Sequence, residues 1–321
     1  MMNDISENTL LSIIIPIYNE EDNIANLIVE LNKCFGKSTI EVEFVFVDDG
    51  SQDLTLSKLF ELGKQLCFQS KIIKLSKNYG SHPALRAGIL HSKAKCITFL
   101  SADLQDPPTL PETLYNELCK GYDIVWAQRE STQAGWFEKG FSFMYAKLMR
   151  KYAIPSYPLK GFDIVIFNEK VKKSLIDNIE ANSSLFLQIL NLGFKQSYIS
   201  YHKNKRIFGK SKWTLSKKIK LFVDSFIAFS YAPIRLVTLT GFLLFFIGLL
   251  WTIFIVIRKV VYNDLEAGWP ALVSILMLGF GTTNISLGII AEYLWRTLDS
   301  SRKRPVFIID EIIEINKNAT T

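Results

Sequence analysis

Acidic side chains follow three short apolar runs in the sequence, where a folded chain could use them together. They lie at residues 18–20 (Tyr-Asn-Glu), 48–49 (Asp-Asp) and 103–106 (Asp-Leu-Gln-Asp). Carboxylates do not bind phosphates directly, but they hold Mg²⁺ or Mn²⁺, and such a cation binds phosphate oxygens. Asp49 is also suited to accept hydrogen bonds from a base N–H or from ribose hydroxyls. The alternative is that these acids only form turns or cap helices, which three clusters in equivalent positions disfavour.

Basic side chains form a second group that is suited to bind an anion. Arg129 follows an apolar run, and residues 206–213 read Arg-Ile-Phe-Gly-Lys-Ser-Lys-Trp. A glycine among Arg, Lys and Ser favours a flexible loop that closes on phosphate, and a solvated basic face is the alternative. Nucleic acid can use the same residue types. Because the basic run adjoins an apolar span, an anionic lipid is the better partner and no nucleic-acid partner is expected.

The elements that must position these residues alternate between strand and helix. Apolar, β-branched runs predict strands over 11–17, 42–47, 72–75, 96–100 and 123–127. Apolar residues at helical spacing predict helices over 24–34, 55–66 and 83–92. This alternation is typical of a mostly parallel sheet with helices on both faces, which binds ligands at the carboxyl ends of its strands. No G-x-G-x-x-G or P-loop motif follows the first strand, so a Rossmann or P-loop site is disfavoured.

The remaining apolar residues are concentrated near the carboxyl end. Of 321 residues, 49% are hydrophobic and 21% are charged, which excludes a disordered chain and a polytopic transporter. Residues 236–257 and 269–291 carry no charge, and each run is long enough for a membrane-spanning helix. Buried core helices are the alternative. We expect a transmembrane hairpin.

The charges flanking the hairpin predict its orientation. Residues 203–220 carry eight basic and no acidic side chains, and three more basic residues lie at 302–304. Positive segments stay in the cytoplasm, so we expect the bulk of the chain and both termini to be cytoplasmic. No signal peptide is expected at the amino end, and the four cysteines are expected to be reduced structural residues.

These observations divide the chain into four expected parts. They are a cytosolic domain over 1–214, an amphipathic juxtamembrane helix over 215–233, the hairpin over 234–296 and a cytosolic tail over 297–321. The juxtamembrane segment has apolar residues at helical spacing with lysines among them, which favours a helix on the membrane surface. A helix packed on the soluble domain is the alternative.

The ordered motifs resemble the family 2 glycosyltransferases of the GT-A fold, specifically the membrane-anchored polyprenyl-phosphate glycosyltransferases. That group includes bacterial O-antigen glucosylation enzymes and dolichol-phosphate mannose synthases, and the resemblance covers nearly the whole chain. The matching segments, in chain order, are Pro16-x-Tyr18-Asn19-Glu20, residues 48–51 (Asp-Asp-Gly-Ser), 78–80 (Asn-Tyr-Gly), 87–88 (Ala-Gly), 102–108 (Ala-Asp-Leu-Gln-Asp-Pro-Pro), 161–163 (Gly-Phe-Asp), Arg206-x-x-Gly209-x-Ser211-Lys212-Trp213 and 304–305 (Arg-Pro).

The resemblance implies a role for each matching residue. The nucleotide-sugar would be bound by Pro16, Tyr18, Glu20, Val47, Asp48, Asp49, Ser101 and Gln105. A Mg²⁺ or Mn²⁺ ion would be held by Asp103 and Asp106, and the acceptor phosphate by Arg129, Arg206, Ser211 and Lys212. Asp163 and Asp103 would be the catalytic residues. The family's metal motif often begins with Asp, whereas this chain has Ser101, so weaker metal affinity is expected.

The implied reaction is inverting transfer of a sugar from a nucleotide-sugar, such as UDP-glucose, to polyprenyl (undecaprenyl) phosphate. It would take place at a bacterial inner membrane, serve cell-envelope glycan modification and involve a homo-oligomer, with a tetramer expected. A processive polysaccharide synthase is one alternative, but it usually needs more spans and a Q-x-x-R-W motif. A non-catalytic membrane adaptor is the other, and Ser101 alone favours it.

Overall fold

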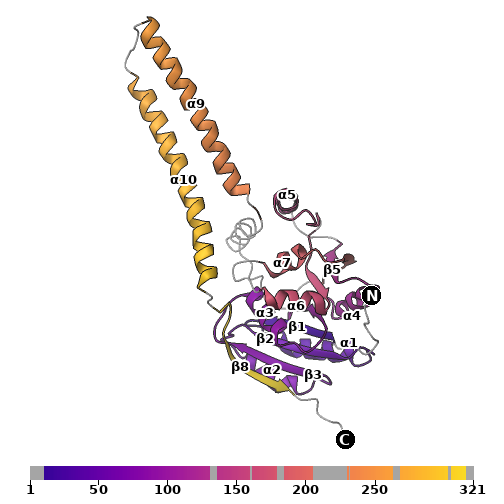
Figure 1. Cartoon of the computed structure of the whole chain (residues 1–321). Helices are drawn as coiled ribbons and strands as arrows, with labels where there is room; N and C mark the ends of the chain where they lie inside the picture. Colours follow the sequence, from indigo (N-terminus) through magenta and orange to yellow (C-terminus); the bar gives the residue numbers. More distant parts are fainter. Residues whose placement is uncertain are drawn as a thin grey trace. The chain divides into compact units, whose positions relative to one another are not determined.

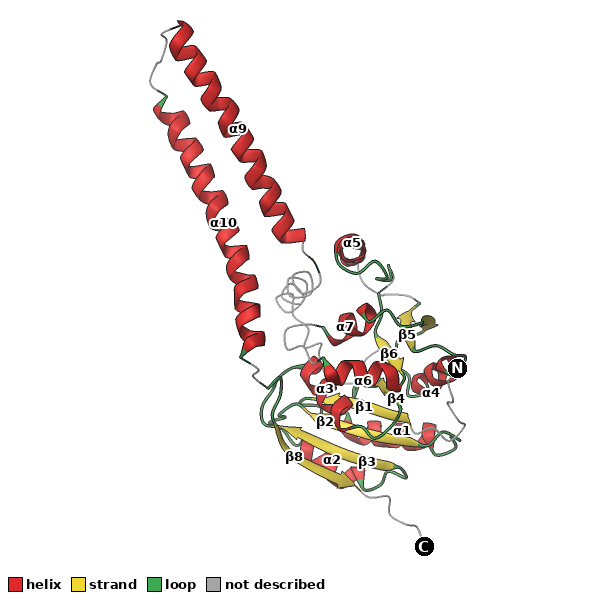
Figure 2. Cartoon of the chain, in the orientation of Figure 1, coloured by secondary structure: helices red, strands yellow, loops and turns green. Residues whose placement is uncertain are grey.

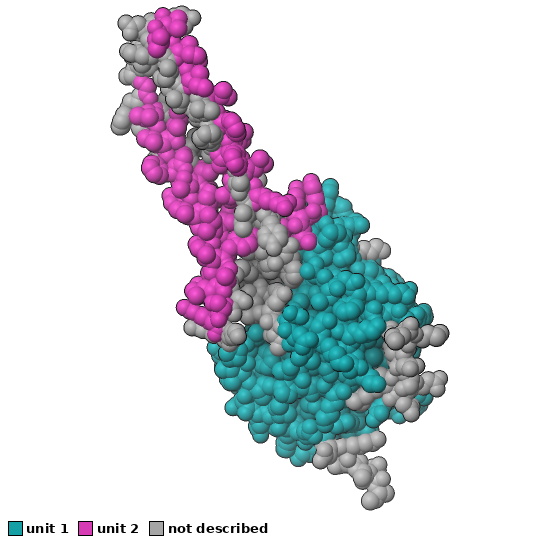
Figure 3. All heavy atoms as spheres, in the orientation of Figure 1, with its two compact units in different colours: residues 1–150, 154–225, 305–321 teal, residues 151–153, 226–304 magenta. Residues whose placement is uncertain are grey.

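The computed structural model describes two compact units of the chain, which Figure 3 colours separately. One unit comprises residues 1–150, 154–225 and 305–321, and the other comprises residues 151–153 and 226–304. The described residues are 11–130, 136–159, 161–178, 184–204, 230, 232–262, 268–302 and 305–315. The second unit is therefore an insertion in the sequence of the first.

An eight-stranded sheet forms the centre of the first unit (Figure 1), with the strand order β7-β5-β6-β4-β1-β2-β3-β8 in the described residues. The strands are β1 (Leu11–Ile17), β2 (Val42–Asp48), β3 (Gln69–Leu75), β4 (Cys96–Phe99), β5 (Ile124–Arg129), β6 (Ile164–Phe167), β7 (Gln196–Tyr201) and β8 (Ile309–Ile315). The neighbours β4, β1, β2 and β3 are parallel, as are β5 and β7, whereas β6 and β8 are antiparallel to their partners.

The sheet confirms the mostly parallel arrangement that the sequence predicts and adds two features to it. The five predicted strands are present, with β3 beginning three residues earlier and β5 continuing through Arg129. The antiparallel strand β6 was not predicted. It is important because its first residue lies at the same edge of the sheet as the carboxyl ends of the parallel strands.

Helices cover both faces of the sheet (Figure 2). The helices of the first unit are α1 (Ile24–Phe35), α2 (Thr55–Gly63), α3 (Ser81–His91), α4 (Leu110–Leu118), α6 (Glu169–Asp177), α7 (Leu185–Asn191) and most of α5 (Trp136–Tyr152). Alternate residues of β1 point to opposite faces. Ile13 and Ile15 join the core that α1, α2 and α4 close. Ile14 meets α3 at Gly88, where an added Cβ would lie 2.4 Å from Ile14 Cγ2.

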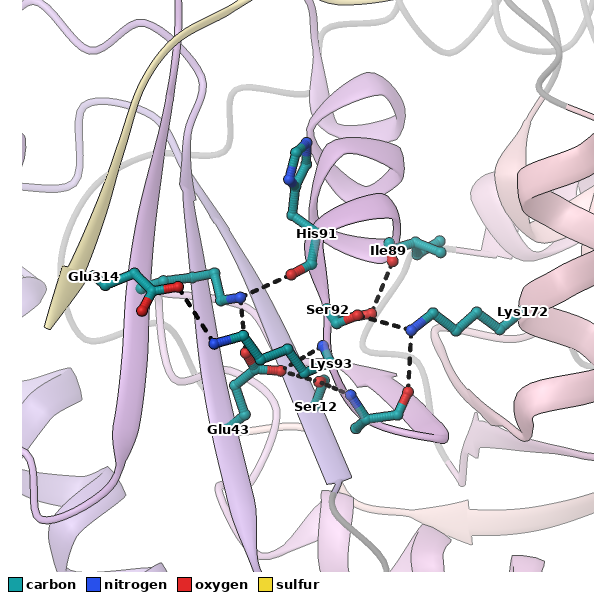
Figure 4. A network of polar contacts seen from close by, with 10 residues as sticks. Ser12, Glu43, Ile89, His91, Ser92, Lys93, Lys172 and Glu314 are labelled. Carbon is teal, nitrogen blue, oxygen red and sulfur yellow. Dashed lines mark hydrogen bonds and ion pairs between the residues drawn. The ribbon is translucent and has the colours of Figure 1, made fainter. Parts of the chain in front are cut away.

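A buried polar network holds the amino edge of the sheet (Figure 4). Lys71 Nζ on β3 lies 2.9 Å from Glu43 Oε1 on β2, and the Glu43 side chain is fully buried. The other Glu43 oxygen accepts hydrogen bonds from Ser12 Oγ at 2.5 Å and from the backbone N–H of Lys93 at 2.9 Å. Lys71 also donates to the carbonyl of His91 at 2.8 Å. The network therefore fastens the turn between α3 and β4 to the beginnings of the central strands.

Two long helices form most of the second unit, α9 (Ala232–Tyr262) and α10 (Trp269–Ser301). They include both uncharged runs of the sequence, and many of their large apolar side chains are exposed. In the part of the chain that the structure describes, no helix meets the combined length and hydropathy of a membrane span. The predicted juxtamembrane segment lies outside the described residues, apart from Ser230 and the start of α9.

The strand β8 follows α10 and returns the chain to the edge of the sheet. It pairs antiparallel with β3, and Ile313 lies opposite Ile72 in the register. Ile315 is buried, and its Cδ1 lies 2.7 Å from the point that a Cβ on Gly63 would occupy. Part of the predicted tail is thus an edge strand of the sheet domain.

Candidate active site

The candidate residues converge on the carboxyl edge of the sheet because of the strand directions. Asp49 and Asp103 follow the parallel strands β2 and β4. Arg129 ends β5, and Asp163 precedes the antiparallel strand β6, which begins at this edge. Loops from both halves of the sheet therefore supply the site, as expected for an open α/β sheet.

The loops after β1 and β2 are joined by hydrogen bonds. The backbone N–H of Asn19 donates to Ser51 Oγ at 2.9 Å, and Asn19 Oδ1 accepts from the backbone N–H of Gln52 at 2.9 Å. The backbone N–H of Glu20 donates to Thr55 Oγ1 at 2.8 Å. Asn19 has φ 49°, a left-handed conformation that Asn tolerates better than most residues. The predicted nucleoside-binding residues of this loop are thus held in a fixed backbone.

Asp49 shapes the loop that begins α3. Its carboxylate oxygens accept hydrogen bonds from the backbone N–H groups of Tyr79 and Gly80, at 2.7 and 2.8 Å. Burial raises the pKa of Asp49, and the two amide hydrogen bonds oppose that rise. Each carboxylate oxygen retains a second lone pair that a ligand N–H or hydroxyl could use. The predicted binding role of Asp49 is therefore compatible with its structural role.

The residues near Asp49 differ in how exposed their side chains are to a ligand. The side chains of Val47 and Asp48 are fully buried in β2, whereas Pro16 and Tyr18 are half-buried at the end of β1. Burial raises the pKa of Asp48, and hydrogen bonds from Ser51 oppose the shift. Direct side-chain contact with a nucleotide is thus easier for Tyr18 than for Val47. The binding roles of all four residues stay predictions.

The segment 101–106 folds into a compact loop after β4. Ser101 Oγ donates to Asp106 Oδ2, and the backbone N–H of Gln105 donates to Asp103 Oδ1 at 3.1 Å. Leu104 has φ 56°, a conformation that is rare for residues other than glycine. Such strain is typical of functional loops. Ser101 therefore orients Asp106 here, a role that the sequence did not indicate.

The donor atoms of this loop fit a hard divalent cation. Asp103 and Asp106 offer carboxylate oxygens, with only 7% and 4% of each residue exposed. Gln105 lies between them in the sequence and carries an amide oxygen. Mg²⁺ and Mn²⁺ prefer such oxygen ligands, and Mg²⁺ is commonly bound by one or two carboxylates together with substrate phosphates. Within the described ranges, no group of three or more His, Cys, Asp and Glu side chains is placed to hold a metal ion.

Asp163 and Arg129 form a two-pronged ion pair. Arg129 Nε donates to Asp163 Oδ2, and Arg129 Nη2 donates to Asp163 Oδ1 at 2.6 Å. The backbone N–H of Asp163 donates to the carbonyl of Ala127 at 3.0 Å. Behind Asp163, the ring of Phe162 packs 4.5 Å from that of Trp126. The ion pair is consequently fixed by β5, β6 and an aromatic contact.

Two residues that sequence reasoning missed complete this cluster. Tyr201 Oη, at the end of β7, lies 2.7 Å from Asp106 Oδ1 and 3.1 Å from Asp163 Oδ2. Lys203 Nζ lies 3.4 Å from Asp106 Oδ1. The sequence signal available was the short run 196–201 (Gln-Ser-Tyr-Ile-Ser-Tyr), whose aromatic and β-branched residues favour a strand directly before the basic motif. The predicted acceptor residues Arg206, Ser211 and Lys212 lie outside the described residues.

Comparison with known proteins places the chain among glycosyltransferases. Residues 12–200 match the family model described as glycosyl transferase family 2. The chain is 32% identical over 311 residues to an uncharacterized glycosyltransferase of Synechocystis sp., covering 94% of this chain and 95% of that protein. It is 27% identical over 320 residues to the undecaprenyl-phosphate 4-deoxy-4-formamido-L-arabinose transferase of Edwardsiella ictaluri, covering 98% of each.

Among solved structures, a mannosyltransferase from Pyrobaculum calidifontis in complex with GDP-Man and Mn²⁺ is similar with a TM-score of 0.46 and 13% identity. That match covers 92% of this chain and 76% of the other. The family model itself runs from β1 to β7 and includes the acidic loops and the Asp163 segment. Because this match spans more than half of the sequence, the chain belongs to glycosyl transferase family 2 and is a glycosyltransferase.

Proposed function

We propose that this protein transfers a sugar from a nucleotide-sugar to polyprenyl (undecaprenyl) phosphate with inversion at the anomeric carbon. The observation that carries the proposal is the cluster of Asp103, Asp106, Asp163 and Arg129 at one edge of the sheet. It places carboxylates suited to a metal-bound diphosphate near a cation suited to an acceptor phosphate. A relative that is similar along 98% of this chain is named for an undecaprenyl-phosphate sugar transfer.

The donor occupies the loops after β1, β2 and β4 in this proposal. Tyr18, Glu20 and Asp49 bind the nucleoside, and Asp103 and Asp106 face the diphosphate. Bound there, Mg²⁺ or Mn²⁺ supplies neutralisation of the negative charge on the diphosphate leaving group. We favour a UDP-sugar such as UDP-glucose. The hydrogen bonds between the loops after β1 and β2 support the proposed nucleoside site, because they hold the residues of that site together.

The transfer forms a bond between an acceptor phosphate oxygen and the anomeric carbon, on the face opposite the leaving group. The bond from that carbon to the diphosphate breaks, and the diphosphate keeps the electron pair. Positive charge develops on the sugar, as in other glycosyl transfers. A phosphate monoester has its second pKa near 6, so the acceptor needs no strong base at neutral pH. Asp163 therefore orients the acceptor or stabilises the positively charged sugar.

Arg129 can hold Asp163 and the acceptor phosphate at the same time. A guanidinium group has five N–H donors, and Asp163 uses one on Nε and one on Nη2. The Arg129 side chain is 37% exposed, and in this proposal its remaining donors bind the acceptor phosphate. This arrangement keeps the catalytic carboxylate beside the incoming phosphate while the cation reduces their mutual repulsion.

We further propose that α9 and α10 form a transmembrane hairpin that anchors the chain to the membrane in which the lipid acceptor lies. Support comes from the uncharged runs 236–257 and 269–291 and from the basic residues on both flanks of the hairpin. The proposed location is the bacterial inner membrane, with the sheet domain and both termini in the cytoplasm. The proposed assembly is a homo-oligomer, such as a tetramer. A cysteine introduced at Gly268 should react with a membrane-impermeant thiol reagent only when the reagent is added on the periplasmic side.

The decisive experiment is a donor screen with the purified full-length chain and undecaprenyl phosphate. Mass spectrometry should detect a lipid-linked monophosphate sugar with one nucleotide-sugar, and EDTA should abolish its formation. A lipid carrying several sugars would instead indicate a processive synthase. Absence of divalent-dependent binding to every nucleotide-sugar would contradict the proposal and favour a non-catalytic adaptor.

A further inference from the structure

The hydroxyl of Tyr201 is placed between the two carboxylates that serve different halves of the proposed reaction. Asp106 lies in the loop 101–106, which we call the metal loop because we propose that the divalent cation binds there. Asp163 lies where we propose that the acceptor phosphate binds. Tyr201 Oη contacts both carboxylates, at 2.7 Å from Asp106 and 3.1 Å from Asp163. A phenol has a single proton to donate. The shorter contact indicates that the proton goes to Asp106, so the contact with Asp163 depends on the neighbouring cations.

Two cationic side chains balance the negative charges of Asp106 and Asp163. Arg129 binds Asp163 through two N–H groups, and Lys203 lies 3.4 Å from Asp106. Two carboxylates and two cations thus surround one neutral phenol. Among the described residues, the Tyr201 hydroxyl is the group that contacts both carboxylates.

The backbone makes Tyr201 a rigid spacer. It pairs in register with Arg129 on the parallel neighbour β5, and its carbonyl accepts the backbone N–H of Glu130 at 3.0 Å. Its ring is buried in the core beneath the sheet, with 6% of the residue exposed. Just beyond it, the backbone N–H of Asn204 donates to the carbonyl of Gln105 at 2.8 Å. The end of β7 is therefore attached to both β5 and the metal loop.

We propose that Tyr201 is a positioning residue that sets the spacing between Asp106 and Asp163. It thereby aligns the donor side with the acceptor side, a role that rests on the proposed function. A hydroxyl in this place acts through the two carboxylates rather than on the substrate. Small misplacements of reacting groups are costly for catalysis, so the loss of this one oxygen should affect turnover more than nucleotide binding.

The test compares Tyr201→Phe with the matched control Tyr198→Phe on the same strand. Tyr198 is 39% exposed, and its hydroxyl contacts neither carboxylate. Tyr201→Phe should lower kcat roughly tenfold to hundredfold, while the nucleotide-sugar affinity measured by calorimetry at saturating Mn²⁺ and the Tm stay close to wild type. Tyr198→Phe should change none of these quantities. Unchanged kcat in Tyr201→Phe, or a variant that fails to fold although it keeps its ring, would overturn the proposal.

A double-mutant cycle distinguishes positioning from a general structural role. If Tyr201 acts through Asp163, then Tyr201→Phe should cause little further loss of kcat in the Asp163→Asn background. Fully additive losses would contradict the assignment. A second readout needs no turnover: Mn²⁺ titration with UDP, followed by electron paramagnetic resonance, should show weaker Mn²⁺ binding in Tyr201→Phe and not in Tyr198→Phe. Equal affinity in Tyr201→Phe and wild type would also contradict it.

The two proposals can fail separately. If the wild type transfers no sugar to undecaprenyl phosphate but hydrolyses a nucleotide-sugar slowly, the proposed acceptor is wrong. The ratio of hydrolysis rates between Tyr201→Phe and wild type then still measures the positioning effect. If the wild type transfers the sugar and Tyr201→Phe transfers it equally fast, the function stands and the role of Tyr201 falls.

Discussion

Two polar networks occupy opposite edges of the same sheet, and they differ in what satisfies their charges. At the amino edge, the side chains of Glu43 and Lys71 are 0% and 5% exposed, and protein groups surround them (Figure 4). At the carboxyl edge, the side chains of Arg129 and Asp163 are 37% and 20% exposed. The Glu43–Lys71 pair is thus shielded from solvent, whereas the Arg129–Asp163 pair is partly exposed.

The contrast teaches that ion pairing alone does not mark an active site. Both edges contain a carboxylate beside a cation, and both pairs join neighbouring strands. A fully buried pair must be saturated by the protein, because an unpaired buried charge is costly. A half-exposed pair at the ligand-binding edge of an α/β sheet can exchange partners with a substrate. The following predictions separate stability at one edge from activity at the other.

The largest effect is expected from Glu43→Gln. It leaves Lys71 buried without a counter-charge, and breaking such a pair costs about 3–5 kcal/mol. Urea unfolding of the full-length chain should show this loss, and the specific activity of the folded fraction should stay near wild type. The control is Glu30→Gln in the exposed Glu30–Lys33 pair, whose lysine side chain is 72% exposed. A loss of activity without a loss of stability would break the proposed contrast.

Asp103→Asn should give the opposite result. Removing one carboxylate from the loop 101–106, where we propose that the metal binds, is expected to lower kcat by about 10²–10³-fold, the size seen when one electrostatic group of an active site is lost. Unfolding free energy should change little. Asp22→Asn, an exposed acid in the loop after β1, is the matched control. Full activity of Asp103→Asn in the transfer assay would remove Asp103 from the catalytic site.

Gly88→Ala should weaken both edges, because α3 connects them. Asp49 binds the amides that begin this helix, and Lys71 binds the carbonyl of His91 at its end. The added methyl would lie 2.4 Å from Ile14 Cγ2, and overpacking of this kind costs about 1–3 kcal/mol. Unfolding experiments should also show that Ile14→Ala offsets part of the loss. Gly140→Ala in α5, where the added Cβ meets no atom of the described residues within 4 Å, should not be destabilising.

The smallest effect at neutral pH concerns His82 at the start of α3. Burial, with a contribution from Arg86, lowers the pKa of His82 to about 4, and among the described residues its buried Nδ1 has no hydrogen-bond partner. Between pH 6.5 and about 4 the unfolded chain therefore binds a proton that the folded chain does not. Stability should fall as the pH is lowered through this window.

His82→Phe should flatten that dependence in Tm measured across pH, with little change near pH 7. His91, whose pKa is lowered by burial and by Lys71, contributes in the same direction, so His91→Gln is the informative comparison. If the fall in Tm between pH 6.5 and about 4 were the same in His82→Phe as in wild type, His82 would be less buried in the folded state than the structure indicates.

The elements and the acidic loops could be predicted because their signals are local. Apolar runs such as 11–17 and 42–47 mark buried strands, and polar residues directly after them mark the ligand-binding edge. The placement of Asp163 could not be predicted in the same way. It depends on β6 running antiparallel between β5 and β4, which involves pairing between segments far apart in the chain.

The sequence by itself determined the alternation of strands and helices and the residue types available for nucleotide and metal binding, since both depend on neighbours in the chain. Only the tertiary structure decided that Tyr201 meets Asp106, 95 residues away, and that Glu43 is a buried structural acid rather than a site acid. The physical reason is that periodicity encodes which face of an element is buried. Contacts between distant polar side chains follow instead from strand order and register, which no local pattern specifies.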